Sequence, residues 1–300
     1  MVAKKHLKIG FRVLISTLLI AFLLFKQDLG GLKEALQSFN IFYLFAALLL
    51  QILGTYVSSL RWREILKTSN LDVPTNLLFT LYTEGYFYNN FLPTQMGGDV
   101  YKSIALGNSI NDQSTSLFSV FMDRFGGLIV LLIMALMGIG SLYGVRGIFL
   151  SVIILVVGLV LYFPVLKFAA KKIKFLNNFK SASDVFMQRK KEASVVLGYS
   201  VLVQLISFAG LYLLFLGLGI KLELWSVLAY MPLTSLAALI PSFNGFGTQE
   251  TVYAYLFPAA GVTVSISVAA SLLIHCVRLI MSLIGGIFML FAVHDKFNRA

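Results

Sequence analysis

Charged residues are scarce in this chain, and their scarcity excludes a soluble fold. Only 12% of the 300 residues are charged, whereas 58% are hydrophobic and the mean hydropathy is +0.87. Soluble domains carry about 25% charged residues, and a water-soluble fold of this length could not hide so much apolar surface. The composition therefore predicts an all-α integral membrane protein in which residues 1–300 form a single membrane domain.

Cysteine is also nearly lacking. Cys276 is the only one, so neither an intramolecular disulfide nor a cysteine-based metal site can form. The net charge of +11 does not indicate a nucleic-acid partner, because the basic residues lie between apolar runs and not on a polar face. Asp-x-Asp and His-x-x-x-His metal motifs, a Gly-rich phosphate loop and a Gly-x-Ser-x-Gly elbow are all missing. We therefore expect no cofactor and no metal site.

Apolar runs of about 17 or more residues are what the chain does contain, and each can cross a bilayer core about 30 Å thick as a helix. There are six: residues 9–25, 41–60, 115–142, 147–166, 194–217 and 263–293. The first follows basic residues as a signal peptide does. However, Phe25-Lys26-Gln27 stands where such a peptide has small residues for cleavage, so we expect a retained anchor.

Two further apolar stretches, 76–92 and 226–258, are interrupted by proline and glycine. Proline removes a backbone donor and glycine permits unusual dihedral angles, so neither stretch is expected to form one continuous helix. Broken backbone at membrane depth is tolerated only against protein or a watery cavity. The sequence therefore predicts two re-entrant helical hairpins, with breaks at Pro93, Gly97, Gly98, Pro241, Gly245 and Gly247.

Lysine and arginine are distributed unequally between the two sides of the six predicted spans. If the N-terminus is inside, eighteen lie on that side, eight of them in a basic loop at 167–193, and four lie on the other side. Because cytoplasmic loops are enriched in Lys and Arg, we expect both termini and this loop in the cytoplasm and the protein in the cell membrane.

A short pattern recurs about half a chain apart. Leu92-Pro93-Thr94-Gln95-Met96-Gly97 and Ile240-Pro241-Ser242-Phe243-Asn244-Gly245 share Pro-[Ser/Thr]-x-x-Gly at an offset of 148 residues. The pseudo-repeats, about 9–142 and 147–293, would each hold two spans, a broken hairpin and one span. The second would enter the membrane from the opposite side. Such inverted repeats are common in secondary transporters, whose substrate site lies between the broken elements.

Three segments carry a resemblance to a known family: Tyr88 to Lys102 (YNNFLPTQMGGDVYK), Asp123-Arg124, and Pro241 to Glu250 (PSFNGFGTQE). They are similar to the signatures of the flippase-like family, also called the lysylphosphatidylglycerol synthase transmembrane region after the membrane half of the multiple peptide resistance factor. The likeness covers about residues 8–293 and implies a translocase for aminoacylated phospholipids or polyprenyl-linked and other glycolipids. The third segment departs from the usual Gly-Gly-x-Gly turn, and nothing resembles the soluble aminoacyl-transferase half.

A charge within a membrane span costs at least about 2.5–3.5 kcal/mol, so an ionisable residue there is a functional candidate, and we single out four. They are Asp123, Arg124, His275 and Arg278. Arginine presents a planar fork that suits a phosphate headgroup, and Asp123 and Arg124 point about 100° apart on a helix, so they need different partners. The alternative is structural ion pairing, for instance Asp123 with Arg278 or Glu84 with Arg124. His275 is either an interior hydrogen-bonded histidine or a proton carrier.

Polar residues also flank the two predicted breaks. They are Glu84, Asn89, Asn90 and Asp99 at the first break, and Asn244, Gln249 and Glu250 at the second. Half-helix ends attract anions at their N-termini and cations at their C-termini, so these side chains are candidates for headgroup contact during transport. Helix capping is the alternative for Asp99, Asn244 and Glu250.

These features favour a lipid translocase that moves a phospholipid or glycolipid headgroup through a polar cavity between the two hairpins. Two other classes stay open: a membrane enzyme that modifies a lipid-linked substrate by aminoacyl or glycosyl transfer, and a non-catalytic subunit of a lipid-processing complex. A membrane lipid is the expected partner. The sequence leaves open a homodimer and a lipid-modifying enzyme as protein partners.

Overall fold

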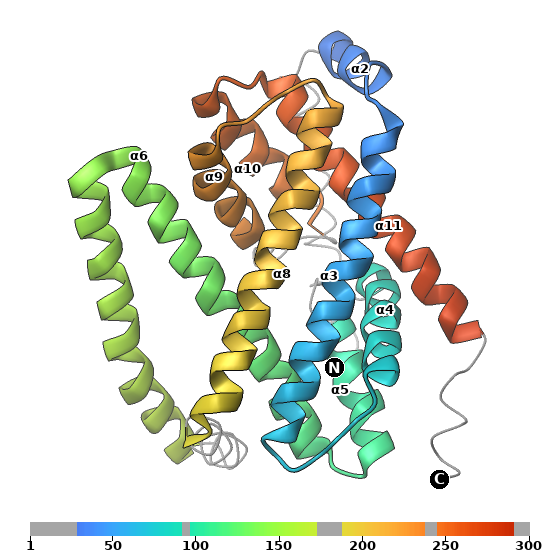
Figure 1. Cartoon of the computed structure of the whole chain (residues 1–300), viewed down its shortest axis with the longest axis vertical. Coiled ribbons are helices and arrows are strands. Elements are labelled where there is room, and N and C mark those ends of the chain that lie inside the picture. Colours follow the sequence, from blue (N-terminus) through green and yellow to red (C-terminus); the bar gives the residue numbers. More distant parts are fainter. Residues whose placement is uncertain (1–28, 92–96, 173–187, 238–244, 291–300) are drawn as a thin grey trace, which may run out of the picture.

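The computed structural model describes residues 29–91, 97–172, 188–237 and 245–290, and the predicted span at 9–25 lies outside them. Within these residues every regular element is a helix, which confirms the all-α membrane fold (Figure 1). The elements are α2 (Leu29–Gln37), α3 (Ile41–Lys67), α4 (Thr75–Phe91), α5 (Gly97–Ile110), α6 (Gln113–Lys172), α8 (Lys190–Gly217), α9 (Leu224–Ala237), α10 (Thr248–Leu256), the 3-10 helix η1 (Phe257–Ala260) and α11 (Val264–Leu290).

Four of the described helices are long and apolar enough to cross a membrane. They cover Ile41–Thr68, Gln113–Gly140, Lys190–Gly217 and Val264–Leu290. These helices coincide with four of the six predicted spans, 41–60, 115–142, 194–217 and 263–293. Each of the four has 27 or 28 residues, about 40 Å at a rise of 1.5 Å per residue, so their ends extend beyond the hydrocarbon core.

The predicted span at 147–166 lies in α6, which folds back on itself at Gly144. This glycine has φ 60° and ψ −146°, a backbone conformation that residues with a side chain rarely adopt. Figure 1 shows the result as two arms joined by a sharp bend. The sequence therefore correctly placed a boundary between residues 142 and 147.

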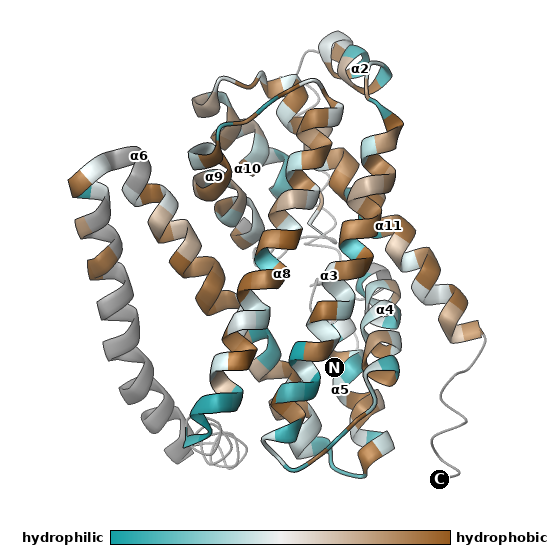
Figure 2. Cartoon of the chain, viewed as in Figure 1, coloured by the Kyte–Doolittle hydropathy of each residue, from teal (hydrophilic) through white to brown (hydrophobic). Residues whose placement is uncertain are grey.

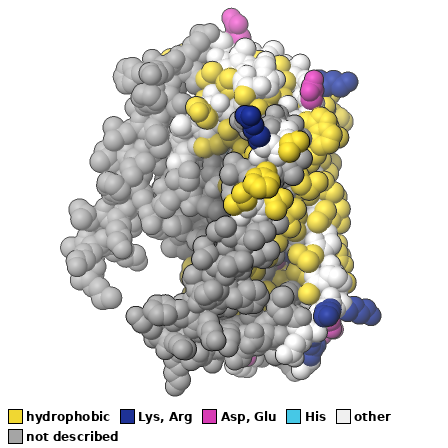
Figure 3. Space-filling model, turned by 90° about the vertical axis from the view of Figure 1, so that its left-hand side faces the viewer, with side chains coloured by type: hydrophobic (Ala, Val, Ile, Leu, Met, Phe, Trp, Pro, Cys, Tyr) yellow, Lys and Arg dark blue, Asp and Glu magenta, His cyan; other side chains and the backbone are white. Residues whose placement is uncertain are grey.

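The outer surface of the helices is apolar along much of its length. On α3, large hydrophobic side chains are exposed at every third or fourth position: Phe42, Phe45, Leu49, Leu53 and Tyr56. Figure 2 shows hydrophobic residues along α3, α8 and α11, and in Figure 3 they cover much of the described side, with Lys and Arg toward its two ends. This distribution suits a helix bundle surrounded by lipid.

A central pair is formed by α3 and α8, which pack against each other along their length. Small residues permit this approach: a Cβ added at Gly54 would lie 3.4 Å from Ile206, and Gly217 lies against Phe39 and Tyr43. Glycine at such positions lets helix backbones approach closely in a membrane, where the hydrophobic effect does not drive helices together.

The first broken stretch forms two antiparallel helices, α4 and α5. Residues 92–96 between them, which include Pro93, lie outside the described residues. The two backbones meet at Gly85 and Gly98, where a Cβ added to Gly98 would lie 2.3 Å from the carbonyl oxygen of Gly85. Tyr88 and Tyr101 stack with ring centroids 4.0 Å apart. Since a side chain at residue 98 would force the helices apart, this glycine is required by packing.

The second broken stretch forms α9 and α10, separated by residues outside the description that include Pro241 and Asn244. Pro232 does not end α9, which continues through it to Ala237. The break comes later, where Gly245 and Gly247 have φ values of 86° and 83°. These positive φ values explain why the pattern places glycine there.

Each of these two helix pairs packs against a helix from the other half of the chain. In the first, α4 lies against α11, where a Cβ added to Gly285 would lie 2.1 Å from the carbonyl oxygen of Thr83. In the second, α9 lies against the first arm of α6, where a Cβ added to Gly138 would lie 2.3 Å from Cα of Ala229. The two halves are thus joined by matching helix contacts at small residues.

Candidate functional site

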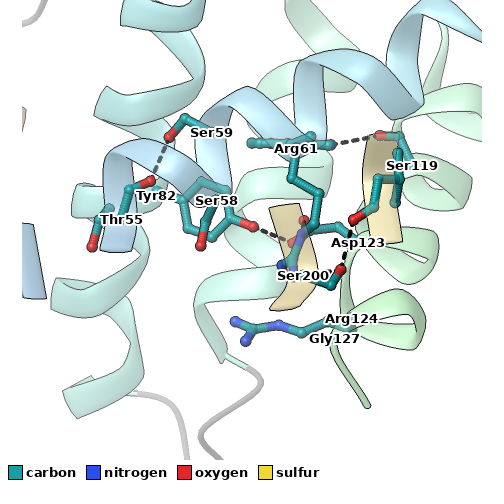
Figure 4. Close-up of polar contacts among 12 residues, drawn as sticks. Thr55, Ser58, Ser59, Arg61, Tyr82, Ser119, Asp123, Arg124, Gly127 and Ser200 are labelled. Atoms are coloured by element: carbon teal, nitrogen blue, oxygen red, sulfur yellow. Dashed lines mark hydrogen bonds and ion pairs between the residues drawn. The ribbon is translucent and has the colours of Figure 1, made fainter. Parts of the chain in front are cut away.

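A buried ion pair joins four helices near the end of α3. Nε of Arg61 donates to Oδ1 of Asp123 at 2.8 Å, and both side chains are almost wholly buried. The hydroxyl of Tyr82 donates to the other carboxylate oxygen, and Nη1 of Arg61 donates to Oγ of Ser200 at 3.2 Å. Figure 4 shows these contacts between α3, α4, α6 and α8. Both charges are therefore paired and hydrogen-bonded, as charges within a membrane protein require.

A second ion-pair system adjoins the first and is centred on Asp99 in the first turn of α5. Arg124 holds this carboxylate with two nearly parallel hydrogen bonds, Nε to Oδ2 at 2.7 Å and Nη2 to Oδ1 at 2.8 Å. Nζ of Lys102 lies 3.0 Å from Oδ1 of Asp99 and 3.7 Å from the ring centroid of Tyr82. Tyr82 therefore links the two systems, by its hydroxyl to Asp123 and by its ring to Lys102.

Exposure separates Arg124 from the rest of this basic cluster, which we define as Arg61, Lys102, Arg124, Asp99 and Asp123. The side chain of Arg124 is 54% exposed, whereas those of Asp99 and Lys102 are 13% and 2% exposed. In Figure 4 Arg124 extends away from the contact between Arg61 and Asp123. The cluster holds three cations and two carboxylates, and its accessible charge is positive, so an anion is the ligand that it favours.

A smaller polar group lies between α10 and α11. Nε2 of His275 lies 3.0 Å from Oε1 of Glu250, and the ring of His275 stacks on Phe246 with centroids 4.1 Å apart. The other oxygen of Glu250 accepts a hydrogen bond from the backbone N–H of Gly247 at 2.7 Å. Nη1 of Arg278 donates to Oε1 of Gln249 at 2.6 Å. The start of α10 is thus tied to α11 by two side-chain contacts.

The sequence matches the family model described as the lysylphosphatidylglycerol synthase TM region over residues 9–286. The chain belongs to this family. It is similar to UPF0104 membrane proteins of three archaea. That of Methanocaldococcus jannaschii is 26% identical, with 96% of this chain and 95% of the relative covered; that of Pyrococcus horikoshii is 25% identical, with 93% and 95% covered. That of Methanothermobacter thermautotrophicus is 24% identical, with 81% and 82% covered. No solved structure matches the chain.

Several of the site residues proposed from the sequence lie close together in the structure. Asp99, Asp123 and Arg124 share the basic cluster, while Glu250, His275 and Arg278 share the polar group of α10 and α11. Glu84 is buried on α4 and accepts a hydrogen bond from the hydroxyl of Tyr101 at 2.7 Å. The side chain of Asn90 lies outside the description, as Asn244 does.

The ion pairs considered from sequence differ from those observed. Asp123 was considered as a partner of Arg278, and Glu84 as a partner of Arg124, but the structure pairs Asp123 with Arg61 and Arg124 with Asp99. The reason is that pairing depends on which helices are neighbours, and periodicity along one helix does not give that information. The prediction that adjacent Asp123 and Arg124 need different partners is confirmed.

The capping alternatives are resolved residue by residue. Glu250 does cap α10, since it accepts from Gly247 at the N-cap position in addition to meeting His275. Asp99 sits in the first turn of α5 but forms ion pairs with Arg124 and Lys102. Asn89 bridges the hairpin, because its Oδ1 accepts from the backbone N–H of Gly98 at 2.7 Å.

Arg61 and Lys102 are functional candidates that the sequence interpretation missed. Both belong to the eighteen basic residues that the sequence interpretation assigns to the inner side, but the structure places Arg61 within α3 and Lys102 within α5, each almost fully buried. For Lys102 the signal was its position three residues after Asp99, a spacing that brings side chains together on a helix. For Arg61 no local signal distinguishes a buried arginine from one at a cytoplasmic helix end.

Proposed function

We propose that this protein translocates the headgroup of a phospholipid or a polyprenyl-linked glycolipid between the leaflets of the cell membrane. The observation that carries the proposal is Arg124, an accessible guanidinium within an apolar span and beside an excess of positive charge. Such a charge costs at least about 2.5–3.5 kcal/mol in the membrane unless protein or water solvates it, so a functional role is the default inference. A planar guanidinium binds phosphate through two hydrogen bonds.

The family supports a role connected with lipid. Its name refers to the membrane region of a lysylphosphatidylglycerol synthase, whereas the three archaeal relatives are described only as membrane proteins. The family name thus supports a lipid as the substrate class, and translocation of its headgroup is the function that we propose for this membrane domain.

Two matching contacts support an inverted repeat, which we include in the proposal. Gly138 and Gly285, which meet the opposite half, are 147 residues apart, and their partners Thr83 and Ala229 are 146 apart. These offsets are close to the 148 residues between the Pro-[Ser/Thr]-x-x-Gly patterns. In Figure 1, α4 and α5 adjoin the lower end of α3, whereas α9 and α10 adjoin the upper end of α8. We therefore interpret each pair as a re-entrant hairpin, entered from opposite sides.

The proposed orientation places both termini and the loop 167–193 in the cytoplasm. Once Arg61 and Lys102 are recognised as buried, sixteen Lys and Arg stay on the inner side against four on the outer side. Arg189, at the start of α8, donates to the carbonyl oxygen of Lys67 at 3.1 Å and to Asn70 at 2.9 Å. The contact places the end of α3 and the start of α8 on one side, which agrees with the proposed orientation.

The test is a leaflet-exchange assay on purified protein in liposomes that contain phosphatidylglycerol labelled with a nitrobenzoxadiazole fluorophore. Dithionite, which does not cross the bilayer, bleaches the outer leaflet, and the rate at which the protected fraction falls measures translocation. We expect Arg124→Gln to lower the protein-dependent rate about tenfold or more, because a charge-assisted contact with the headgroup is lost. Unfolding measurements should show that the variant is folded, since Asp99 keeps Lys102 as a partner.

Arg63→Gln is the matched control. Arg63 also holds a carboxylate with two hydrogen bonds, to Asp72 at 2.8 and 3.1 Å, but it lies in the last turns of α3 and its partner Asp72 is 65% exposed. Equal rates for Arg124→Gln and Arg63→Gln would refute the headgroup role. A changed lipid mass in the vesicles would indicate an enzyme, and neither exchange nor a changed mass would indicate a non-catalytic subunit.

A further inference from the structure

The contact between Arg124 and Asp99 has the geometry of a bound phosphate. Two nitrogen atoms of one guanidinium point at two oxygen atoms of one anion, at 2.7 and 2.8 Å. The two non-bridging oxygens of a phosphodiester present the same arrangement to an arginine fork. A carboxylate and a phosphodiester therefore compete for the same two N–H donors.

The two sides of this contact differ in accessibility. The carboxylate of Asp99 reaches Arg124 from the protein interior, with 13% of its side chain exposed, whereas 54% of the Arg124 side chain is exposed. Asp99 accepts from only two of the five N–H donors that a guanidinium carries. An incoming anion can thus reach the guanidinium before the contact with Asp99 is broken.

The residue before Asp99 is packed and hydrogen-bonded, so we expect exchange to occur by movement of the Arg124 side chain. Gly98 packs directly on Gly85, and the N–H of Gly98 donates to Asn89. These contacts tie the start of α5 to α4. Since Asp99 cannot follow Arg124 outward, a shift of the guanidinium toward a ligand separates the pair.

Lys102 lowers the electrostatic cost of separating Asp99 from Arg124, because it remains a cationic partner of the carboxylate. Its Nζ lies 3.0 Å from Oδ1 of Asp99 and is held over the ring of Tyr82 at 3.7 Å, with Trp62 at 5.1 Å. After Arg124 leaves, the carboxylate is still paired with a cation. Because the basic cluster holds three cations and two carboxylates, one monoanionic phosphodiester brings its charge to zero, which lowers the electrostatic cost of binding in a low-dielectric site.

We propose that Asp99 occupies the phosphate site of Arg124 in the unloaded protein, and that Lys102 retains Asp99 when a phosphodiester headgroup displaces it. The inference rests on the proposed function and deepens it, because it assigns an anionic phosphodiester as the group recognised. It also makes Asp99 and Lys102 positioning residues that set the affinity of Arg124 without contacting the headgroup.

Equilibrium binding of dihexanoyl phosphatidylglycerol to the purified full-length chain in maltoside detergent, measured by calorimetry, tests the exchange. Asp99→Asn removes the competing charge and should tighten binding about tenfold, roughly the effect of one charge-assisted contact. Lys102→Gln leaves Asp99 with Arg124 alone and should weaken binding by a similar factor. Asp72→Asn, the same change in the exposed pair with Arg63, should leave binding unchanged.

Opposite responses of the Asp99 and Lys102 variants distinguish exchange from structural damage, since simple loss of a buried group would weaken binding in both. Binding by Asp99→Asn no tighter than by Asp72→Asn would overturn the proposal. Should Asp99→Asn fail to fold, unweakened binding by Lys102→Gln overturns it equally.

Two further arms separate the sources of phosphate and the two proposals. Dihexanoyl glycerol, which has no phosphate, should not bind. If inorganic phosphate shows the opposite responses and the lipid does not, the lipid assignment is overturned. If both variants respond as expected but the wild type moves no lipid in vesicles, the proposed function fails and the exchange stands. If transport depends on Arg124 but the two variants do not show opposite binding responses, the proposed function stands and the exchange fails.

Discussion

Replacement of Arg61 by methionine should destabilise the protein far more than its single ion pair suggests. Arg61 is buried against Asp123, so Arg61→Met leaves a carboxylate without its cation in the interior. Loss of one partner of a buried pair costs about 3–5 kcal/mol, and Ser200 also loses a hydrogen bond worth about 1 kcal/mol. We therefore expect a loss of roughly 4–6 kcal/mol in the free energy of unfolding, a large share of the 5–15 kcal/mol typical of a protein.

The double variant Arg61→Met, Asp123→Leu should be clearly less destabilised than Arg61→Met alone. With both charges removed no buried charge is left unpaired, and apolar replacement of a buried pair is often neutral. The hydroxyl of Tyr82 loses its acceptor, which costs about 1–3 kcal/mol. The coupling energy between the two positions should therefore exceed about 2 kcal/mol.

Unfolding by sodium dodecyl sulfate in mixed micelles, followed by circular dichroism, gives the free energies for this double-mutant cycle. The same cycle at the exposed pair of Arg63 and Asp72 is the control, and there we expect less than about 1 kcal/mol. Additive effects at Arg61 and Asp123, or a single variant within about 0.5 kcal/mol of the wild type, would show that the charges are not mutually dependent.

Three other perturbations test the packing and caps of the helices. Gly98→Ala should destabilise by about 1–3 kcal/mol in the same unfolding assay, because a Cβ would lie 2.3 Å from the backbone oxygen of Gly85. Glu250→Ala should cost about 1–3 kcal/mol and Glu250→Gln less, because glutamine still offers an acceptor to the start of α10. Hydrogen bonds from the hydroxyl and N–H of Thr115 hold the pKa of Asp112 below its usual value. The ionised carboxylate should therefore stabilise α6 above about pH 4, and this stabilisation should be lost as the pH falls further. Unfolding measured as a function of pH would detect the loss.

Controls for these variants are available within the chain. Gly198→Ala in α8 meets no atom within 4 Å and should be neutral or slightly stabilising, so a similar loss there would show that the effect at Gly98 is not steric. Asp112→Asn keeps an acceptor for the cap but does not titrate. A decline in its stability below pH 4 as steep as that of the wild type would assign the effect to other carboxylates.

The sequence predicted four of the six spans because an apolar run long enough to cross a bilayer is a local feature. Four of the predicted runs coincide with described helices, and the break at Gly144 follows from a single residue with positive φ. It predicted the two broken stretches for the same reason, since proline and glycine act locally. Pro232 is the exception: a proline within an apolar stretch did not end α9, whereas positive φ at Gly245 and Gly247 did mark the break.

The ion-pair partners could not be predicted, because they depend on contacts between distant segments. Arg61 and Asp123 are 62 residues apart, and Arg124 and Asp99 are 25 apart. An arginine at the end of an apolar run can be a cytoplasmic topology signal or the buried partner of a carboxylate. Which of the two it is depends on the helices that pack over it. Arg61 was therefore counted among the cytoplasmic charges, although Ser200 and Asp123 enclose it.

The adjacent residues Asp123 and Arg124 differ in how far the protein encloses them, although they belong to the same turn of α6. Because they point in different directions, Asp123 is enclosed by Arg61 and Tyr82, whereas Arg124 remains accessible and is paired with Asp99. A charge enclosed on all sides cannot accept a ligand without loss of the fold, and an accessible charge can. Substitutions at Arg61 and Asp123 should therefore lower stability in proportion to any loss of transport. Substitutions at Arg124 should lower transport while the free energy of unfolding stays within about 1 kcal/mol of the wild type. A stability loss at Arg124 as large as that at Arg61 would instead assign both arginines a structural role.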